Sequence, residues 1–497
     1  MRTRHGLVTV LLFLSAVLPA TAKKLIETGW DMPDTKRLRE NFAAMEQQPF
    51  DGAIVQAVGK PGPLSVAFSN ITWRHDDFQN CLDDLRACRF NRFRDNFVLL
   101  GANPGNVDWF DDAGWQTIVE HWRIAAWLAK HGGLRGILFD PEPYTEPHAQ
   151  FKQTTQPQAK QHSFDDYRAK ARQRGREVMQ AVAAEFSDLT LFCYFMNSVQ
   201  HGVPRPSDGY GLYPAFIDGW LDAAPPTVTF VDGCENAYTF KTVNQYLEAA
   251  VQIKGTAQEH ISPANRSKYR AQVQVSFGIY LDAYANPPTS PWHVPGKTDA
   301  LRNNVTTALR VADEYVWVYG EKSRWWPTRN KSANEHTWEE TLPGCTAVLG
   351  FVRDPVGWAR DQIARQPSEV KLAGTWDTWQ ADGSHGSFKW DKGALTGCAT
   401  QVVNGCFIQS VPAQPGERYA VRAKRRHDGW LRVRWQTADH KWTHELDDQI
   451  FTAPGPSGQW SEIFGVVTVP EGVGRLVILL CVEGHAEFDA VHLYRLP

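Results

Sequence analysis

Hydrophobic runs and amphipathic stretches alternate along the chain from residue 24 to about residue 319. Apolar residues that recur every three or four positions, as at Trp115, Ile118, Trp122 and Ala126, predict helices, and the short apolar runs between them predict strands. The predicted strands are Leu25–Trp30, Gly52–Ala57, Asn96–Ala102, Gly136–Phe139, Leu189–Met196, Thr227–Asp232, Val273–Leu281 and Tyr315–Tyr319. Strand–helix alternation repeated eight times in about 300 residues indicates an α/β fold, a parallel (β/α)8 or TIM barrel.

An open, doubly wound parallel sheet is the alternative to the barrel. That fold usually carries a glycine-rich phosphate loop after its first strand. Here Gly29-Trp30-Asp31-Met32-Pro33 stands at that place, so the barrel is favoured.

The pattern changes after about residue 367 to short alternating strands separated by Gly, Pro and Asp turns. Examples are Arg418–Ala423, Trp430–Gln436, Glu462–Val469 and Arg475–Cys481. Such a pattern is typical of an antiparallel β-sandwich, here jelly-roll-like. We therefore expect a barrel domain over residues 23–367 and a sandwich over residues 368–497, with residues 346–366 finishing or packing under the barrel.

The first residues read as a targeting signal. Arg2, Arg4 and His5 precede an apolar run from Leu7 to Leu18, and Ala20-Thr21-Ala22 is a small-residue cleavage site. We expect residues 1–22 to be removed as a signal peptide, which predicts a secreted or periplasmic protein. The apolar run is too short to span a membrane, so no stable membrane insertion is expected.

Composition narrows the classes of partner. Among 497 residues, 42 % are hydrophobic, 22 % are charged and the net charge is −3, which gives no basic footprint for nucleic acid. The 20 Trp and 14 Tyr are more unusual, because aromatic faces stack on sugars, although most such rings are expected in the core. The eight cysteines show no spacing typical of zinc sites, and no metal or organic cofactor is implied. Cys398 and Cys406 could bridge two neighbouring strands.

Acids, amides and aromatic rings gather at the carboxyl ends of the predicted strands. The clearest stretch is Gly136 to Tyr144, an apolar run that ends in Asp140, Glu142 and Tyr144, with Glu142 held between two prolines. In a parallel barrel these strand ends form the face that carries the chemistry. The candidate site residues are Trp30, Asp31, Gln56, Asn103, Asp140, Glu142, Tyr144, Tyr194, Asn197, Asp232, Glu235, Tyr238, Tyr280, Asp282, Glu321, Trp325 and Trp326.

Carboxyl groups beside aromatic rings suit the cleavage of glycosidic bonds. One carboxyl must donate a proton to the leaving oxygen, and a second carboxylate, or a group on the substrate, must meet the cationic sugar carbon. We expect Glu142 to be the general acid/base, with Glu235 or Glu321 as nucleophile or base. The expected partner is an oligo- or polysaccharide.

Two resemblances to glycoside hydrolases support this hypothesis. Gly136 to Tyr144 resembles the fourth-strand motif of chitinase-like enzymes, which implies that Asp140 and Tyr238 position a substrate acetamido group that acts as nucleophile. Leu138 and Pro141 depart from that motif, which has an aspartate and a tryptophan there. Glu142-Pro143 also resembles the Asn-Glu-Pro end of strand 4 in retaining barrels, although Pro141 replaces the Asn and strand 7 offers Asp282 rather than Glu.

The last strand suggests what the second domain does. Phe488 to Tyr494 resembles the final strand of carbohydrate-binding modules. That resemblance implies glycan binding by the sandwich, although a sandwich that only braces the barrel is an equal alternative.

Several interpretations stay open. The whole protein could bind glycans without cleaving them, or, less favoured because the rim has few His or Arg residues, act as a polysaccharide lyase. Asp31 and Asp282 could simply form turns after their strands. Lys322 and Arg324 could neutralise Glu321, and Trp325-Trp326 could pack under the sandwich.

Overall fold

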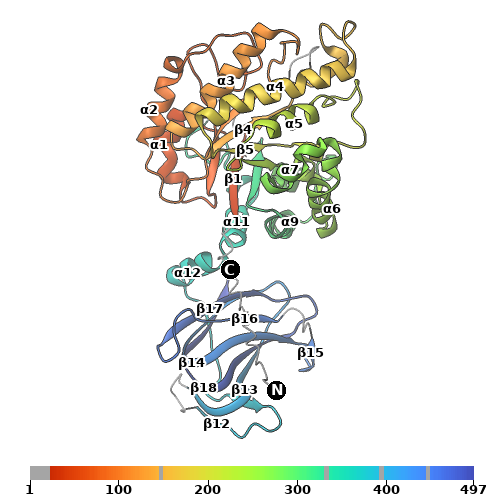
Figure 1. Ribbon diagram of the computed structural model, residues 1–497. Coiled ribbons are helices and arrows are strands. Elements are labelled where there is room, and N and C mark those ends of the chain that lie inside the picture. Colours follow the sequence, from red (N-terminus) through yellow and green to blue (C-terminus); the bar gives the residue numbers. More distant parts are fainter. Residues whose placement is uncertain (1–22, 145–148, 330–334, 391–396, 444–447) are drawn as a thin grey trace, which may run out of the picture. The chain divides into compact units, whose positions relative to one another are not determined.

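The computed structural model describes the chain in two compact units, which divide between Leu349 and Gly350. Figure 1 shows both, and each is described here by itself. The described residues are 23–144, 149–329, 335–390, 397–443 and 448–497. The predicted signal peptide, residues 1–22, lies outside them.

The first unit is built on a curled parallel sheet with helices packed around it (Figure 1). Its strands lie in the order β7-β6-β5-β4-β3-β2-β1-β9-β8, so strands that follow one another in sequence are neighbours in space. The strands lie where the hydrophobic runs predict them: β1 (Lys24–Gly29), β2 (Gly52–Val55), β3 (Phe97–Gly101), β4 (Gly136–Asp140), β5 (Thr190–Cys193), β6 (Thr229–Asp232), β7 (Val273–Val275), β8 (Gly278–Tyr280) and β9 (Tyr315–Gly320).

The hydrogen-bonded ladder is not closed, unlike that of the barrel expected from the sequence. The predicted strand Val273–Leu281 is interrupted, so that β7 pairs with β6 and β8 pairs with β9. Ser276 and Phe277 join the two segments, and each makes one backbone hydrogen bond, to Asp232 and Trp317 respectively. A curled sheet whose two edges are linked by the chain itself therefore replaces a continuous eight-stranded ladder.

Helices connect the strands and cover the sheet with apolar faces. In α3 the predicted stripe is fully buried, including Trp115, Ile118 and Trp122. Ser163 caps α4 and pairs with Asp166 in a capping box, as the sequence predicts. The helices of this unit are α1 (Thr35–Met45), α2 (Gln79–Ala87), α3 (Asp112–His131), α4 (Phe164–Glu185), α5 (Tyr213–Ala223), α6 (Val243–Lys254), α7 (Arg266–Gln272), α8 (Asp282–Ala285), α9 (Lys297–Val311) and α10 (Trp338–Thr341), and α11 (Cys345–Arg353) contains the division between the units.

Among the described residues, none of the helices combines the length and the apolar character that crossing a bilayer requires.

The second unit is an antiparallel β structure around its own core. Phe407, Leu431, Trp435, Leu480 and Phe488 are buried together in that core. Its strands are β10 (Glu369–Val370), β11 (Asp377–Gln380), β12 (Ser387–Trp390), β13 (Gly397–Pro412), β14 (Arg418–Gln436), β15 (Trp442–Thr443), β16 (Gln449–Phe451), β17 (Ser461–Thr468) and β18 (Arg475–Leu496). The order β11-β13-β18-β14-β15 places the three longest strands side by side.

Two details of the second unit differ from the expectation. The predicted strands Arg418–Ala423 and Trp430–Gln436 form one strand, β14, because irregularities in register absorb the Asp428-Gly429 turn signal without ending the ladder. Helix α12 (Pro355–Arg365) packs in this unit, since Ala359 is fully buried with residues of β14 and β18.

The cysteine positions also correct one expectation. Cys398 and Cys406 lie on the same strand, β13, and so do not face each other across neighbouring strands. Cys406 is instead opposite Cys481 of β18 in the antiparallel register, and both thiols are buried.

Candidate active site at the carboxyl ends of the strands

The end of β4 holds its acidic residues in a defined turn. Asp140, the last residue of β4, accepts a hydrogen bond at Oδ1 from the backbone N–H of Glu142 at 2.9 Å. Asn103, just past β3, accepts one from the Tyr144 N–H at 2.9 Å and donates one to the Glu142 carbonyl at 3.2 Å. A carboxylate and an amide from adjacent strands therefore fix the backbone that carries Glu142.

Tyr144 is the exposed end of this turn, and its side chain bonds back to Glu142. Its hydroxyl donates to Oε2 of Glu142 at 2.5 Å, the bond expected of a hydroxyl facing a carboxylate. The Glu142 side chain is half-buried and so remains reachable from outside.

Glu235 reaches the same place from β6. It begins the short 3₁₀ helix η4 (Glu235–Thr239), directly after Cys234, whose left-handed backbone (φ +45°) turns the chain sharply at the end of the strand. Burial, with the charges of Glu142 and Asp140 nearby, raises the pKa of Glu235 to about 8. The strand-end carboxyl groups of β4 and β6 are therefore close enough to affect each other's protonation.

The pKa of Asp140 is raised by the same two causes. Burial and the charge of Glu142 raise the pKa of Asp140 to about 7, although the hydrogen bond from the Glu142 N–H opposes the shift. We call Asp140, Glu142 and Glu235 the acidic trio. The charges of Asp140 and Glu142 oppose the ionisation of Glu235, and the charge of Glu142 opposes that of Asp140.

Tyrosine and tryptophan rings line the site beside the acidic trio. The Tyr238 ring stacks with Tyr280 (centroids 5.2 Å apart) and Tyr319 (5.7 Å), and Tyr194 stacks with Trp317 (4.6 Å). The charge of Glu235 raises the pKa of Tyr238 in addition to the larger effect of burial. The Tyr238 hydroxyl is buried and meets no partner with hydrogen-bond geometry in the described part of the chain, although it lies close enough to Glu235 to act on that carboxyl group.

Two tryptophans leave about half of their surface exposed next to these rings. Trp30, which is 51 % exposed, lies within hydrogen-bonding reach of Tyr319. Trp292, which is 48 % exposed, meets Tyr280 edge to face at 6.0 Å. Buried tyrosines with exposed tryptophan edges form a surface suited to flat, partly apolar ligands.

The predicted site residues do not include Trp292, Tyr210 or Trp317. Trp292 belongs to a proline-rich insertion, residues 286–297, that follows the seventh predicted strand, and an exposed Trp in such a loop is a usable signal. Tyr210 lies in the loop before α5, where burial first and then the acidic trio raise its pKa. Trp317 belongs to β9, and no sequence signal separates it from ordinary core.

Asp31 and the tryptophans after β9 brace the fold instead. The Asp31 carboxylate binds Arg37 at 2.6 Å and accepts the N–H groups of Trp325 (2.8 Å) and Trp326 (3.1 Å). Both indole rings are buried, and Trp326 donates to Glu27 at 3.1 Å, so neither ring offers a face to a ligand.

The Asp232 carboxylate likewise has its hydrogen-bonding positions filled by groups of the protein. Its carboxylate accepts the N–H groups of Met196 (3.0 Å), Ser198 (2.9 Å) and Cys234 (3.2 Å) and the Ser198 hydroxyl. Asn197, which begins η3 (Asn197–Val199), is fully buried beside it. These residues tie together the loops after β5 and β6 and thereby place Glu235.

The remaining candidates lie outside the acidic trio. The backbone N–H of Gln56 bonds to Pro33 at 2.8 Å and joins β2 to the loop after β1. Asp282 is buried and accepts the Glu321 N–H at 2.8 Å, and burial raises its pKa to about 6. Glu321 lies beside Tyr280 and Tyr319, whose pKa values burial raises most and its charge raises further.

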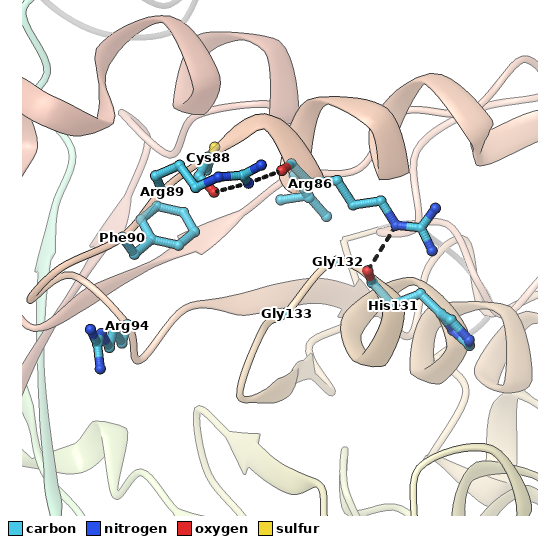
Figure 2. A pocket seen from close by; sticks show the side chains of 9 residues that line it. Arg86, Cys88, Arg89, Phe90, Arg94, His131, Gly132 and Gly133 are labelled. Atoms are coloured by element: carbon cyan, nitrogen blue, oxygen red, sulfur yellow. Dashed lines mark hydrogen bonds between the residues drawn. The ribbon is translucent and has the colours of Figure 1, made fainter.

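A separate, basic cavity of about 440 Å³ lies at the other end of the strands, before β3 and β4 (Figure 2). Arg86, Arg89, Arg94 and His131 line it, and Arg86 donates to the His131 carbonyl at 3.2 Å. Its charge is opposite to that of the acidic trio, so it is not part of the same site.

No family model and no curated protein matches this chain. Among solved structures, parts of it resemble the carbohydrate-binding module CBM4 (17 % identity, TM-score 0.20, 25 % of this chain and 88 % of that chain). They also resemble the CBM22-1–GH10 modules of endo-1,4-β-D-xylanase 10B from Clostridium thermocellum in complex with xylohexaose (12 %, 0.22, 27 % and 29 %). A third is the arabinose-bound MgGH51 α-L-arabinofuranosidase (12 %, 0.19, 26 % and 25 %).

These neighbours are glycoside hydrolases and carbohydrate-binding modules, and the chain spans less than a third of the length of the two enzymes. Likenesses at TM-scores near 0.2 assign neither a family nor a substrate. The function proposed below rests on the site itself.

Proposed function

We propose that the protein is a glycoside hydrolase whose reaction is carried by Glu142 and Glu235, at the ends of β4 and β6. The observation that carries this proposal is the acidic trio, in which burial and neighbouring charge raise the pKa of Glu235 to about 8. Most glycoside hydrolases use one protonated and one ionised carboxyl group on either side of the bond. Two carboxyl groups in different environments supply that pair.

The environments assign the roles. Glu235 holds its proton at neutral pH and so is the proton donor to the leaving oxygen. Glu142 accepts the Tyr144 hydroxyl and is the carboxylate that attacks the anomeric carbon or activates water. This is the reverse of the role expected for Glu142 from the sequence. The reversal rests on the burial and the neighbouring carboxyl charges that raise the pKa of Glu235, which a sequence does not display.

Asp140 and Tyr238 favour an N-acetylated sugar as the substrate. The Tyr238 hydroxyl is buried, lies close to Glu235 and makes no hydrogen bond of full geometry in the described residues, so it can donate to a ligand oxygen bound beside that carboxyl group. Asp140, with a pKa near 7, is suited to orient an acetamido N–H. In that version the acetamido oxygen attacks the anomeric carbon, and Glu142 assists.

A panel of purified glycans, both N-acetylated and not, tests the proposal when incubated with the mature chain, Glu142→Gln and Glu235→Gln. Glu248→Gln is the matched control, because Glu248 is exposed on α6, away from the strand ends. We expect cleavage by the unmodified chain and by the control, and a loss of it in both site variants. Activity that survives in both site variants would exclude the assignment.

The stereochemistry of the product separates the mechanisms. Proton NMR of the first-formed anomer distinguishes retention from inversion. Cleavage confined to N-acetylated substrates, with retention, supports participation of the acetamido group. Glycan binding without cleavage by any variant would instead favour a non-catalytic glycan-binding protein.

We also propose that the chain is exported after cleavage behind Ala22, which rests on the pattern of its first residues. Intact-mass measurement of the protein recovered from its native source should give a chain that begins at Lys23. A chain that retains residues 1–22 would contradict this.

A further inference from the structure

The side chains of two histidines and one glutamate converge in the second unit, whereas the acidic trio belongs to the first. His427 of β14 and His485 and Glu487 of β18 each offer one nitrogen or oxygen, and these atoms all lie within 4.8 Å of one another. The three side chains are half-buried. Sequence spacing gave no sign of this group, because its members come from two strands that are far apart along the chain.

The backbone at His427 brings the ring to this group. In the register of β14 and β18, His427 is opposite Ala486, which is fully buried in the core. His485 and Glu487 flank Ala486 and point to the other face, because side chains alternate along a strand. The left-handed conformation of His427 (φ +68°) takes its ring out of that alternation, so that it lies 4.5 Å from the His485 ring.

A neutral His485 ring presents one lone pair to the group. Its Nδ1 lies 3.0 Å from the carbonyl oxygen of Ala399. A carbonyl oxygen only accepts, so Nδ1 carries the hydrogen and a neutral ring leaves Nε2 as an acceptor. Metal-binding histidines are commonly oriented by such a bond from the second nitrogen to a backbone carbonyl.

A carboxylate oxygen of Glu487, which is also an acceptor, lies opposite this lone pair. Oε1 of Glu487 lies 3.4 Å from Nε2 of His485, while Oε2 is held by Arg426 of β14. Either a hydrogen on Nε2 or a cation between the two atoms would join them, and a divalent ion can take that place when the His485 ring is neutral. Arg426 occupies the other oxygen and orients the carboxylate, as second partners of metal-binding carboxylates do.

We propose that His427, His485 and Glu487 bind one divalent transition-metal ion, for which Zn²⁺ is the best fit. Two imidazole nitrogens and one carboxylate oxygen suit Zn²⁺, whereas Ca²⁺ and Mg²⁺ prefer oxygen ligands alone. His427 also lines a cavity of about 630 Å³, which gives the ion a route from solvent. The acids Asp428 and Glu483 and the arginines Arg425 and Arg432 line the same cavity, so their charges balance. The bound ion joins β14 to β18, the two longest strands of the unit.

Calorimetric titration of the full mature chain with ZnCl₂, after removal of metal with EDTA, tests the site. We expect one ion per chain. His427→Ala and His485→Ala should each weaken binding by at least about tenfold, since even the loss of an outer-shell partner costs about that much. The control is His385→Ala, which changes an exposed histidine of the same unit and should leave the affinity unchanged.

Thermal unfolding gives a second readout. Saturating Zn²⁺ should raise the Tm of the metal-free chain, because the ion binds only the folded arrangement of donors, and it should not raise the Tm of either site variant. CaCl₂ at the same concentration should do nothing. Circular dichroism and the metal-free Tm check that the variants fold.

The proposal is overturned if the metal-free chain takes up no Zn²⁺. It is equally overturned if folded His427→Ala and His485→Ala bind Zn²⁺ as the unmodified chain does. Neither result depends on the proposed glycosidase activity, because both are binding measurements in the absence of glycan.

Discussion

Residues of one chemical type serve different purposes in this protein, and their surroundings decide which. Glu142 and Glu235 both lie at the carboxyl ends of the strands. Burial and neighbouring carboxyl charges raise the pKa of Glu235 to about 8, whereas Glu142 accepts a tyrosine hydroxyl. The proposed roles of proton donor and acceptor rest on this difference, as in enzymes that use two carboxyl groups in two roles.

The pH dependence of activity should follow the proton on Glu235. Because its pKa is about 8 and the donor must be protonated, kcat/KM should fall as the pH rises through about 8. Glu235→Gln should lower kcat by about 10²–10⁴-fold and abolish this alkaline limb. A substrate with an activated aryl leaving group, which needs no proton, should be much less affected. An alkaline limb that persists in Glu235→Gln would assign the proton to another group.

Ionisation of a buried glutamate outside the site should lower the free energy of unfolding. Glu27 of β1 is fully buried, and burial raises its pKa to about 8 from 4.5. Between these values the folded state binds more protons than the unfolded state, so the free energy of unfolding falls as the pH rises from about 4.5 to 8.

Glu27→Gln removes that dependence while its side-chain oxygen can still accept from the Trp326 N–H. We expect this change to raise the free energy of unfolding at pH 8.5 by roughly 2–4 kcal/mol and to have little effect at pH 4.5. Urea unfolding at the two pH values measures it, with Glu248→Gln as control. Equal effects at both pH values would show that ionisation is not the cause.

Sequence reasoning at this scale found the acids of the rim but not their partners. Asp31 and Asp232 have the same signature as Asp140, an aspartate after a buried strand. The structure shows that both carboxylates accept hydrogen bonds from backbone N–H groups of other loops. Whether a carboxylate stays available depends on those loops, which a local pattern of residues does not describe.

At the scale of elements, the loop that carries Glu142 is held by a neighbouring strand. The Asn103 side chain makes two hydrogen bonds to the backbone of residues 142–144. Asn103→Ala should lower kcat by about 10–100-fold through misplacement of Glu142, because small displacements at a reacting centre are costly.

As a positioning residue, Asn103 should affect kcat more than KM and leave the shape of the pH profile unchanged. Loss of two hydrogen bonds should also cost about 1–3 kcal/mol in the free energy of unfolding. Asn91→Ala is the control, since the Asn91 side chain bonds only to Glu46 among the described residues. A change in the alkaline limb would indicate that Asn103 acts on the proton and not on position.

Hydrophobic periodicity predicts where the strands lie far better than how they pair. Each predicted strand of the first unit overlaps an observed one, because burial of an apolar run in a parallel sheet is a local property. The interruption between β7 and β8 and the irregularities that keep β14 whole are properties of pairing. Strand pairing depends on other strands far away in the sequence, so the local pattern of apolar and polar residues does not reveal it.

At the scale of the whole molecule, the two units carry different chemistry. The acidic trio lies on the parallel sheet of the first unit, and the His427, His485 and Glu487 group lies on the antiparallel strands of the second. Each unit has its own packed core, so each should fold as a cooperative unit.

The extent of the second unit leads to a further prediction. Helix α12 precedes the first strand of this unit, and its Ala359 is buried with Ala420, Tyr494 and Leu496. Arg360 of the same helix lies 4.1 Å from the Phe464 ring and pairs with Glu462. These contacts belong to the second unit even though the change in composition that first suggested a boundary comes later, near residue 367.

A chain of residues 350–497 should therefore be more stable than one of residues 368–497. Removal of α12 uncovers apolar surface around Ala420 and Phe464, and we expect it to lower the free energy of unfolding by about 2–4 kcal/mol. Urea unfolding of the two fragments, followed by tryptophan fluorescence, measures the difference. Equal stability would mean that α12 adds nothing to this core, and that the composition change near residue 367, rather than the packing of Ala359, marks where the second unit begins.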